Sequence, residues 1–202
     1  MKIALIGVTG RVGSRLATEL LSRGHAVTGI ALHVPPVARA GLPAVQADAA
    51  DPNSLAPRLV GHDAVISASR FVTSDADALI AATKTAGVKR LLVVGGAGSL
   101  EVAPGKALLD TDGFPEAFKS EPTAGARYLE RLMAEPGLDW TFLSPSADFA
   151  RGERTEHFRL GGDQLLRDAR GKSHISMEDF AIAMVDDVEQ HAHSRQRFTA
   201  GY

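Results

Sequence analysis

The chain has 202 residues, which is enough for one well-buried domain and too few for two full ones. Its 22 basic and 24 acidic side chains give a formal net charge of −2, and no stretch gathers the basic ones into a patch, so nucleic acid is a poor first guess as a partner. The absence of cysteine excludes disulfides, thiolate metal sites and cysteine nucleophiles.

In the first half of the chain, short apolar runs alternate with helical patterns, which is typical of a parallel sheet wound with helices. We expect strands over residues 2–7, 25–32, 44–47, 64–68 and 90–94. The first helix is predicted to begin near Val12 and end at Gly24, and the second to be capped by Asp51 with Pro52 in its first position. A third is expected to start at Thr73 or Ser74 and stop at Gly87.

Proline and glycine interrupt the next segment, 100–122, and a segment of that length without regular structure is more often functional than idle. The second half then predicts a helix over 123–133, a strand over 140–143, a small hairpin or pair of edge strands from the runs 157–160 and 164–166, a helix capped by Ser176, and a strand over 197–200. We therefore predict a single α/β domain over 1–202, a Rossmann-type doubly wound parallel sheet with a small C-terminal substrate-side extension. Segments 100–122 and 148–175 are the expected substrate-side insertions.

The most informative motif is Gly7-x-x-Gly10-x-x-Gly13, which joins the first strand to the first helix. Gly7 suits a tight turn out of the strand, Gly10 lets a backbone approach a pyrophosphate, and Gly13 lets the helix pack close to the strand. Free N–H groups at the helix start would face the anion. The alternative is a glycine-rich turn that binds nothing, since the spacing differs from G-x-G-x-x-G.

With Thr9 inside that motif, the chain resembles the atypical short-chain dehydrogenase/reductases, in particular the NAD(P)H-binding, NmrA-like group that includes flavin reductase and biliverdin reductase B. Gln46-Ala47-Asp48, the run 63–68 and Ser144-Pro145 agree with the resemblance, which runs the whole length. The group contains both reductases and proteins that bind the nucleotide without turning it over.

The resemblance implies which residues bind the cofactor. They are Gly7, Thr9, Gly10, Arg11 and Val12 at the pyrophosphate, Asp48 and Ala49 at the adenine, Ala68 and Ser69 at the ribose, and Pro145 beside the nicotinamide. Each has a plainer alternative: Thr9 could cap the helix, Asp48 could be a turn residue, and Pro145 could simply end its strand.

The choice between NAD(H) and NADP(H) depends on the residues after the second strand. Leu32-His33-Val34-Pro35 has neither the acidic residue that binds a ribose 2′-hydroxyl nor an arginine for a 2′-phosphate. With no carboxylate to repel a phosphate, and with Arg11 and Arg39 nearby, the sequence favours NADP(H) weakly. Protonated His33 would help bind that phosphate, and affinity would then fall as the pH rises. The alternative for His33 is an ordinary exposed residue.

Catalytic residues are harder to find. Many dehydrogenases of the superfamily use a tyrosine and a lysine four residues apart, but Tyr128 is followed by Leu132 at that spacing and Tyr202 is the last residue. Flavin reduction is less demanding, because water can complete the protonation and cofactor placement carries most of the work. Ser99 is the candidate catalytic residue, as a hydrogen-bond donor to the substrate; its alternative is a turn residue. Asp186, Asp187, His191 and His193 fit a charged helix end better than a metal site, so no metal is expected.

Our leading hypothesis is an NAD(P)H-binding oxidoreductase that reduces a flavin, quinone or similar planar acceptor, with Phe114, Phe118 and Phe149 as candidates to stack on it. The alternatives are a redox sensor that binds the dinucleotide without turnover, and an isomerase or epimerase. No apolar run is long enough for a membrane span and the first residues lack a signal-peptide pattern, so we expect a cytoplasmic protein with no membrane or nucleic-acid partner. A homodimer is also possible.

Overall fold

The computed structural model describes residues 1–34 and 39–202, and its centre is an eight-stranded sheet in the order β10-β12-β8-β5-β4-β1-β2-β3. The strands of this sheet are β1 (Lys2–Ile6), β2 (Ala26–Ala31), β3 (Ala44–Gln46), β4 (Ala64–Ser67), β5 (Arg90–Val94), β8 (Asp139–Pro145), β10 (Arg159–Gly161) and β12 (Gln196–Gly201). Every pairing in it is parallel except that of β10 with β12. The predicted Rossmann-type α/β fold is confirmed.

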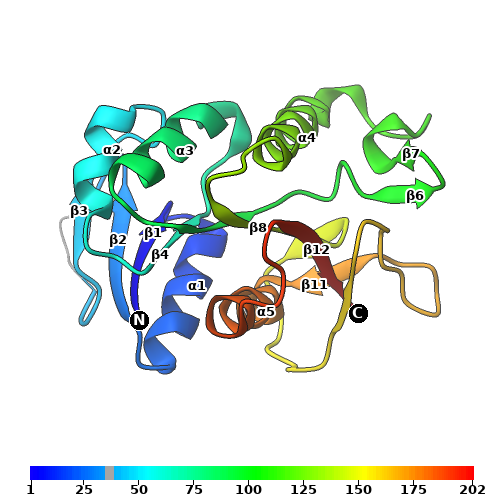
Figure 1. The fold of residues 1–202 in the computed structure, drawn as a ribbon. Coiled ribbons are helices and arrows are strands. Elements are labelled where there is room, and N and C mark those ends of the chain that lie inside the picture. The colour runs from blue at the N-terminus through cyan, green and yellow to red at the C-terminus, as the bar shows by residue number, and fades with distance from the viewer. Residues whose placement is uncertain (35–38) are drawn as a thin grey trace.

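Helices cover both faces of this sheet (Figure 1). On one face lie α1 (Arg11–Ser22) and α5 (Met177–Gln190), whose apolar side chains form one buried cluster with the sheet. On the other lie α2 (Pro52–Leu59), α3 (Ala76–Thr85) and α4 (Ser120–Met133), which share a second cluster. Because both faces are covered, β4 and β5 are buried along their whole length, as expected for parallel strands with near-continuous apolar sequence.

Two predicted helix starts are displaced. The third helix begins at Ala76 rather than at Thr73 or Ser74, because the carboxylate of Asp75 accepts the N–H of Asp77 at 3.0 Å and a short 3-10 turn occupies Phe71–Thr73. Helix α4 begins at Ser120, ahead of the predicted residue 123. Pro122 is tolerated in its first turn, where a backbone N–H would have no helical acceptor.

Residues 157–160 and 164–166 do not form the predicted hairpin, and of the alternative pair of edge strands only the first run forms one. The first run becomes β10 and pairs antiparallel with β12, which protects that edge of the main sheet, while Gln164 bridges to Glu101. Elsewhere in the same insertion, β11 (His174–Ser176) pairs in parallel with β9 (Asp148–Ala150). Pairing with a long neighbouring strand outweighed the local turn signal.

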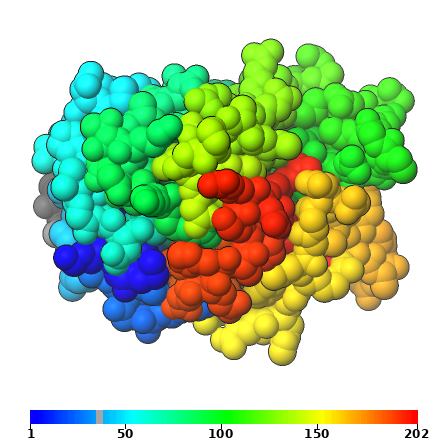
Figure 2. Space-filling view, in the orientation of Figure 1, coloured from blue at the N-terminus to red at the C-terminus, as the bar shows by residue number. Residues whose placement is uncertain are grey.

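The segment 100–122 contains only short elements: β6 (Glu101–Ala103), β7 (Lys106–Ala107) and 3-10 turns over Leu108–Asp110 and Glu116–Phe118. In the space-filling view this green segment lies beside the orange part of the second insertion, at the same end of the molecule (Figure 2). Both insertions therefore gather at one end of the molecule.

Candidate functional site

The glycine turn after β1 is shaped by backbone contacts that a side chain would block. Gly7 has a φ of +78°, and a β-carbon on it would lie 2.7 Å from the carbonyl oxygen of Ala68. A β-carbon on Gly13 would lie 2.1 Å from the carbonyl oxygen of Gly7, which already accepts the N–H of Gly10 at 2.9 Å. Glycine at positions 7 and 13 therefore lets the turn, α1 and the end of β4 approach one another closely.

The N-terminus of α1 offers unpaired donors beside this turn. Gly10 is the N-cap and has no side chain to cap the helix, and the first bond to it comes from the N–H of Ser14 at 3.0 Å. The N–H groups of Arg11, Val12 and Gly13 precede that bond and have no acceptor within the helix. With no acidic residue in the first turn and the positive end of the helix dipole directed here, the turn fits an anionic group such as a phosphate.

A cavity of about 240 Å³ extends from this turn along the carboxyl ends of β1 to β4. It brings together seven of the residues predicted to bind the cofactor, which are Gly7, Thr9, Gly10, Asp48, Ala49, Ala68 and Ser69. Asp48 is exposed, and one of its carboxylate oxygens accepts the N–H of Ala50 at 2.9 Å. The other oxygen takes no part in that turn, so Asp48 can both shape the turn and bind a ligand. The N-cap of α1 is Gly10, so the alternative that Thr9 caps the helix is wrong.

Arg70, which the sequence did not indicate, lines the same cavity, as does Leu32 from the segment after β2. The side chain of Arg70 is 71% exposed, and its guanidinium lies 3.7 Å from a carboxylate oxygen of Glu121. That carboxylate also accepts the N–H groups of Phe71 at 2.7 Å and Val72 at 3.2 Å, which fixes the loop after β4 against α4. The signal in the sequence that could have identified Arg70 is its position directly after Ser69.

Five predicted residues lie outside this cavity. Arg11 and Val12 are the first residues of α1, where their N–H groups face the turn, and His33 is exposed next to Leu32. Pro145 is the buried last residue of β8, which is separated from β4 by β5. The cofactor preference was predicted from Leu32-His33-Val34-Pro35, and Pro35 lies outside the described residues.

Ser99 is the fifth predicted residue outside the cavity, and it contacts β12. The guanidinium of Arg197 donates to both the hydroxyl and the carbonyl oxygen of Ser99 at 3.0 Å. Arg197 in turn lies opposite Phe142, in the middle of β8. This places Ser99 as an anchor for the loop after β5, and its catalytic role stays a prediction.

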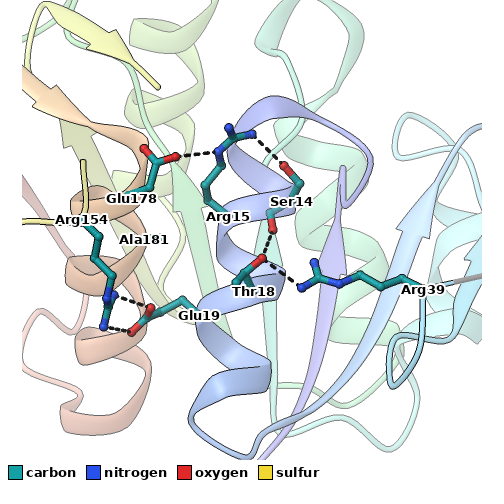
Figure 3. A pocket seen from close by; sticks show the side chains of 8 residues that line it. All are labelled: Ser14, Arg15, Thr18, Glu19, Arg39, Arg154, Glu178 and Ala181. Carbon is teal, nitrogen blue, oxygen red and sulfur yellow. Dashed lines mark hydrogen bonds and ion pairs between the residues drawn. The ribbon is translucent and has the colours of Figure 1, made fainter. Parts of the chain in front are cut away.

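A second cavity, of about 340 Å³, lies between α1 and α5 and is lined by paired charges (Figure 3). Arg15 contacts Glu178 at 3.1 Å, and Arg154 contacts Glu19 at 2.6 Å. These ion pairs tie α1 to α5 and to the chain after β9. Four of the five charged side chains in the lining form these two ion pairs, and the fifth, Arg39, donates to the hydroxyl of Thr18 at 3.1 Å, so the contacts brace α1 against its neighbours.

The charged end of α5 is also a structural feature. The carboxylate of Asp187 accepts from Arg90 at 2.6 Å and contacts the His193 ring at 2.7 Å. Within residues 1–34 and 39–202, no group of three or more histidine or acidic side chains could hold a metal ion. The same residues include no helix long and apolar enough to cross a membrane.

Known proteins match this architecture along the whole chain. The NAD(P)H-binding family matches residues 7–191. A "putative exported protein" from Burkholderia pseudomallei is 47% identical, with a TM-score of 0.91 and 100% of each chain covered. A "putative epimerase" from Bacteroides thetaiotaomicron is 41% identical, with a TM-score of 0.93, 100% of this chain and 96% of that chain covered.

A third solved structure, a "putative NADH-flavin reductase" from Streptococcus pneumoniae, is 33% identical, with a TM-score of 0.87 and 100% and 99% of the two chains covered. The glycine turn, the free amides of α1 and the cavity at the carboxyl ends of the strands are what such a family requires of its dinucleotide site. The chain belongs to the NAD(P)H-binding family, within the atypical short-chain dehydrogenase/reductase, NmrA-like group.

Proposed function

We propose that this protein is an NAD(P)H-dependent reductase that passes a hydride to a flavin, quinone or similar planar acceptor. The observation that carries the proposal is the glycine turn, whose shape and free amides fit a pyrophosphate. In the reaction, NAD(P)H loses a hydride and becomes NAD(P)⁺, while the acceptor gains the hydride and a proton from water. The solved relative named for NADH-flavin reductase supports this choice of acceptor.

The chain's own residues would bind and orient the dinucleotide. The amides of Arg11, Val12 and Gly13 would hold the pyrophosphate, and Asp48 and the loop after β4 would hold the adenosine half. Pro145, at the carboxyl end of β8, would lie beside the nicotinamide. Placing the two planar rings together in this way supplies most of what hydride transfer needs.

A delocalised acceptor suits a site in which Tyr128 is not available as a proton donor. Tyr128 has the position on α4 from which an acid could come, but it is buried, and its hydroxyl has no hydrogen-bond partner among the described residues. Burial, followed by the nearby charge of Asp75, raises the pKa of Tyr128, which makes it a poor acid. Ketone or alcohol chemistry, in which an oxyanion develops, would therefore gain no proton from Tyr128.

A preference for NADP(H) is part of the proposal. Arg70 adds an exposed cation to the adenosine cavity, and Leu32 and His33 after β2 bring no carboxylate. A 2′-phosphate close to Arg70 would gain from that positive charge, whereas Asp48, the acidic residue in the lining, is expected at the adenine. The same cavity would accept NAD(H) without that gain.

A second candidate is a redox sensor that binds the dinucleotide without turnover. It is favoured by the bond from Arg197 to Ser99, because the one side chain predicted for catalysis is already engaged in holding a loop. The two candidates share their cofactor site and differ only in whether the bound nucleotide is oxidised.

The experiment is a paired titration with NADPH and NADH, followed by addition of FMN or a quinone while nicotinamide absorbance is recorded. Binding followed by loss of that absorbance supports the reductase. Binding without oxidation across several acceptors favours the sensor, and no binding of either nucleotide overturns the cofactor site. A cytoplasmic location, a homodimer, and the lack of nucleic-acid and membrane partners stay predictions.

A further inference from the structure

A third cavity, of about 680 Å³, lies where the two insertions meet and just beyond β8. Leu108 lines it from the segment 100–122, and the second insertion contributes Leu165, Arg167, Lys172, Ser173 and His174. Asp148, the first residue of the second insertion, and Ala147, which precedes it, complete the lining. Its volume is within the range of small-molecule sites, about 300–1,000 Å³.

This cavity begins close to the proposed position of the nicotinamide. Ala147 is two residues after Pro145, and two residues span at most about 7 Å of extended chain. The N–H of Ala147 donates to the hydroxyl of Ser173 at 3.1 Å, and the N–H of Asp148 to the carbonyl oxygen of Ser173 at 2.9 Å. The second insertion is thereby fixed against the chain that leaves β8. A planar acceptor beside Pro145 could extend a side chain of several atoms into the cavity.

The cavity also presents two basic side chains that are not neutralised. Neither Arg167 nor Lys172 forms an ion pair with any described residue, and Asp148 is the single acidic residue in the lining. The guanidinium of Arg167 donates to the carbonyl oxygen of Gly171 at 2.9 Å, which leaves its other donors available. The His174 ring packs against Tyr202 with its centroid 4.9 Å away and adds a further polar edge.

A closed turn fixes the backbone between these two residues. The N–H of Asp168 donates to the carbonyl oxygen of Lys172 at 2.8 Å, so the residues that flank the turn are brought together. A carboxylate oxygen of Asp168 accepts the N–H groups of Arg170 and Lys172, each at 2.8 Å. Because the backbone of the turn is fixed before any ligand arrives, binding needs little ordering of the main chain.

We propose that this cavity binds the phosphate of the acceptor, so that the substrate class is a phosphorylated flavin, FMN, in preference to neutral riboflavin. The inference rests on the proposed reductase function and specifies its acceptor. Lysine and arginine form charge-assisted hydrogen bonds to phosphate oxygens, and a neutral flavin or quinone gains nothing from them. The isoalloxazine ring would lie toward Pro145 and the phosphate toward Lys172.

The test compares the KM for FMN with the KM for riboflavin, at saturating NADPH, in the wild type and two variants. Lys172→Ala removes a lining cation, and Arg170→Ala is its matched control because it removes the same charge from the same turn but does not line the cavity. We expect a lower KM for FMN than for riboflavin in the wild type. Lys172→Ala should raise the KM for FMN about tenfold and leave riboflavin unchanged, and Arg170→Ala should behave as the wild type. Equal KM values for the two flavins in the wild type, or equal effects of the two variants, would overturn the inference.

A binding measurement separates this inference from the function on which it rests. If neither flavin oxidises NADPH, the proposed reductase function fails, and titration of each flavin by its fluorescence in the presence of NADP⁺ then decides the site. Tighter binding of FMN that Lys172→Ala abolishes supports the phosphate site. Equal binding of FMN and riboflavin contradicts it. Oxidation with both flavins at equal KM leaves the reductase standing and removes the phosphate site.

Discussion

Gly13 lies so close to Gly7 that a β-carbon on Gly13 would stand 2.1 Å from the carbonyl oxygen of Gly7. That distance is much shorter than a van der Waals contact. The obstructing atom belongs to the backbone, so a change of side-chain rotamer cannot relieve the clash. The first turn of α1 and the glycine turn therefore keep their positions only while residue 13 has no side chain. The proposed pyrophosphate site depends on this contact.

Gly13→Ala should weaken NADPH binding at least about tenfold, because α1 must move away from the turn and its free amides move with it. Nicotinamide fluorescence titration measures the affinity, and circular dichroism checks that the variant is folded. Gly162→Ala is the control, since a β-carbon there meets nothing within 4 Å. Equal affinities of Gly13→Ala and the wild type would show that the dinucleotide binds elsewhere.

Arg70→Gln should reduce affinity for NADPH about tenfold and leave affinity for NADH nearly unchanged, because only NADPH carries the 2′-phosphate that the guanidinium would contact. Paired titrations of the variant and the wild type measure the ratio of the two affinities. Arg58→Gln, on α2 and outside the cavity lining, is the matched control. A parallel loss for both nucleotides would instead indicate a general role for Arg70, such as contact with the adenine.

Asp187→Ala should lower the free energy of unfolding by about 3 kcal/mol, because it removes the buried partner of the Arg90 guanidinium and leaves only the more exposed Asp139 to pair with it. Urea unfolding followed by circular dichroism measures the change. The neighbouring Asp186 pairs with Arg23 at a partly exposed site, so Asp186→Ala should cost at most about 1 kcal/mol. Similar losses in both variants would contradict the buried ion pair at Arg90.

Asp179→Asn should destabilise the protein near neutral pH, and the difference from the wild type should shrink as the medium becomes acidic. Burial alone would raise the pKa of Asp179, but hydrogen bonds from Thr155, Glu156 and Tyr202 outweigh it and lower that pKa. A lowered folded-state pKa contributes stability above the unfolded value, about 3.9, and loses it as the pH falls below that value. Urea unfolding at a series of pH values measures the difference, and a difference that stays constant from pH 7 to the acid limb would argue against this assignment.

The sequence predicted the sheet and most of the cofactor cavity because both depend on local patterns. Apolar runs located every strand of the parallel core, and the positions of Gly7, Asp48 and Ala68 at strand ends brought them to one edge. The partners of β10 and Ser99 were not predictable in this way. Each is set by β12, a strand far away in the chain, through pairing with Gln196–Gly201 and a bond from Arg197. Arg70 was missed because its role depends on the loop held by Glu121, a contact between residues far apart in sequence.

The most direct test of the cofactor site is titration of the wild type and Gly10→Asp with NADPH, monitored by nicotinamide fluorescence. Gly10 is the N-cap of α1, and a carboxylate there would occupy the phosphate position and repel the pyrophosphate. We expect that the wild type binds NADPH and that Gly10→Asp, shown to be folded by circular dichroism, does not. No binding by the wild type, or undiminished binding by Gly10→Asp, would contradict it.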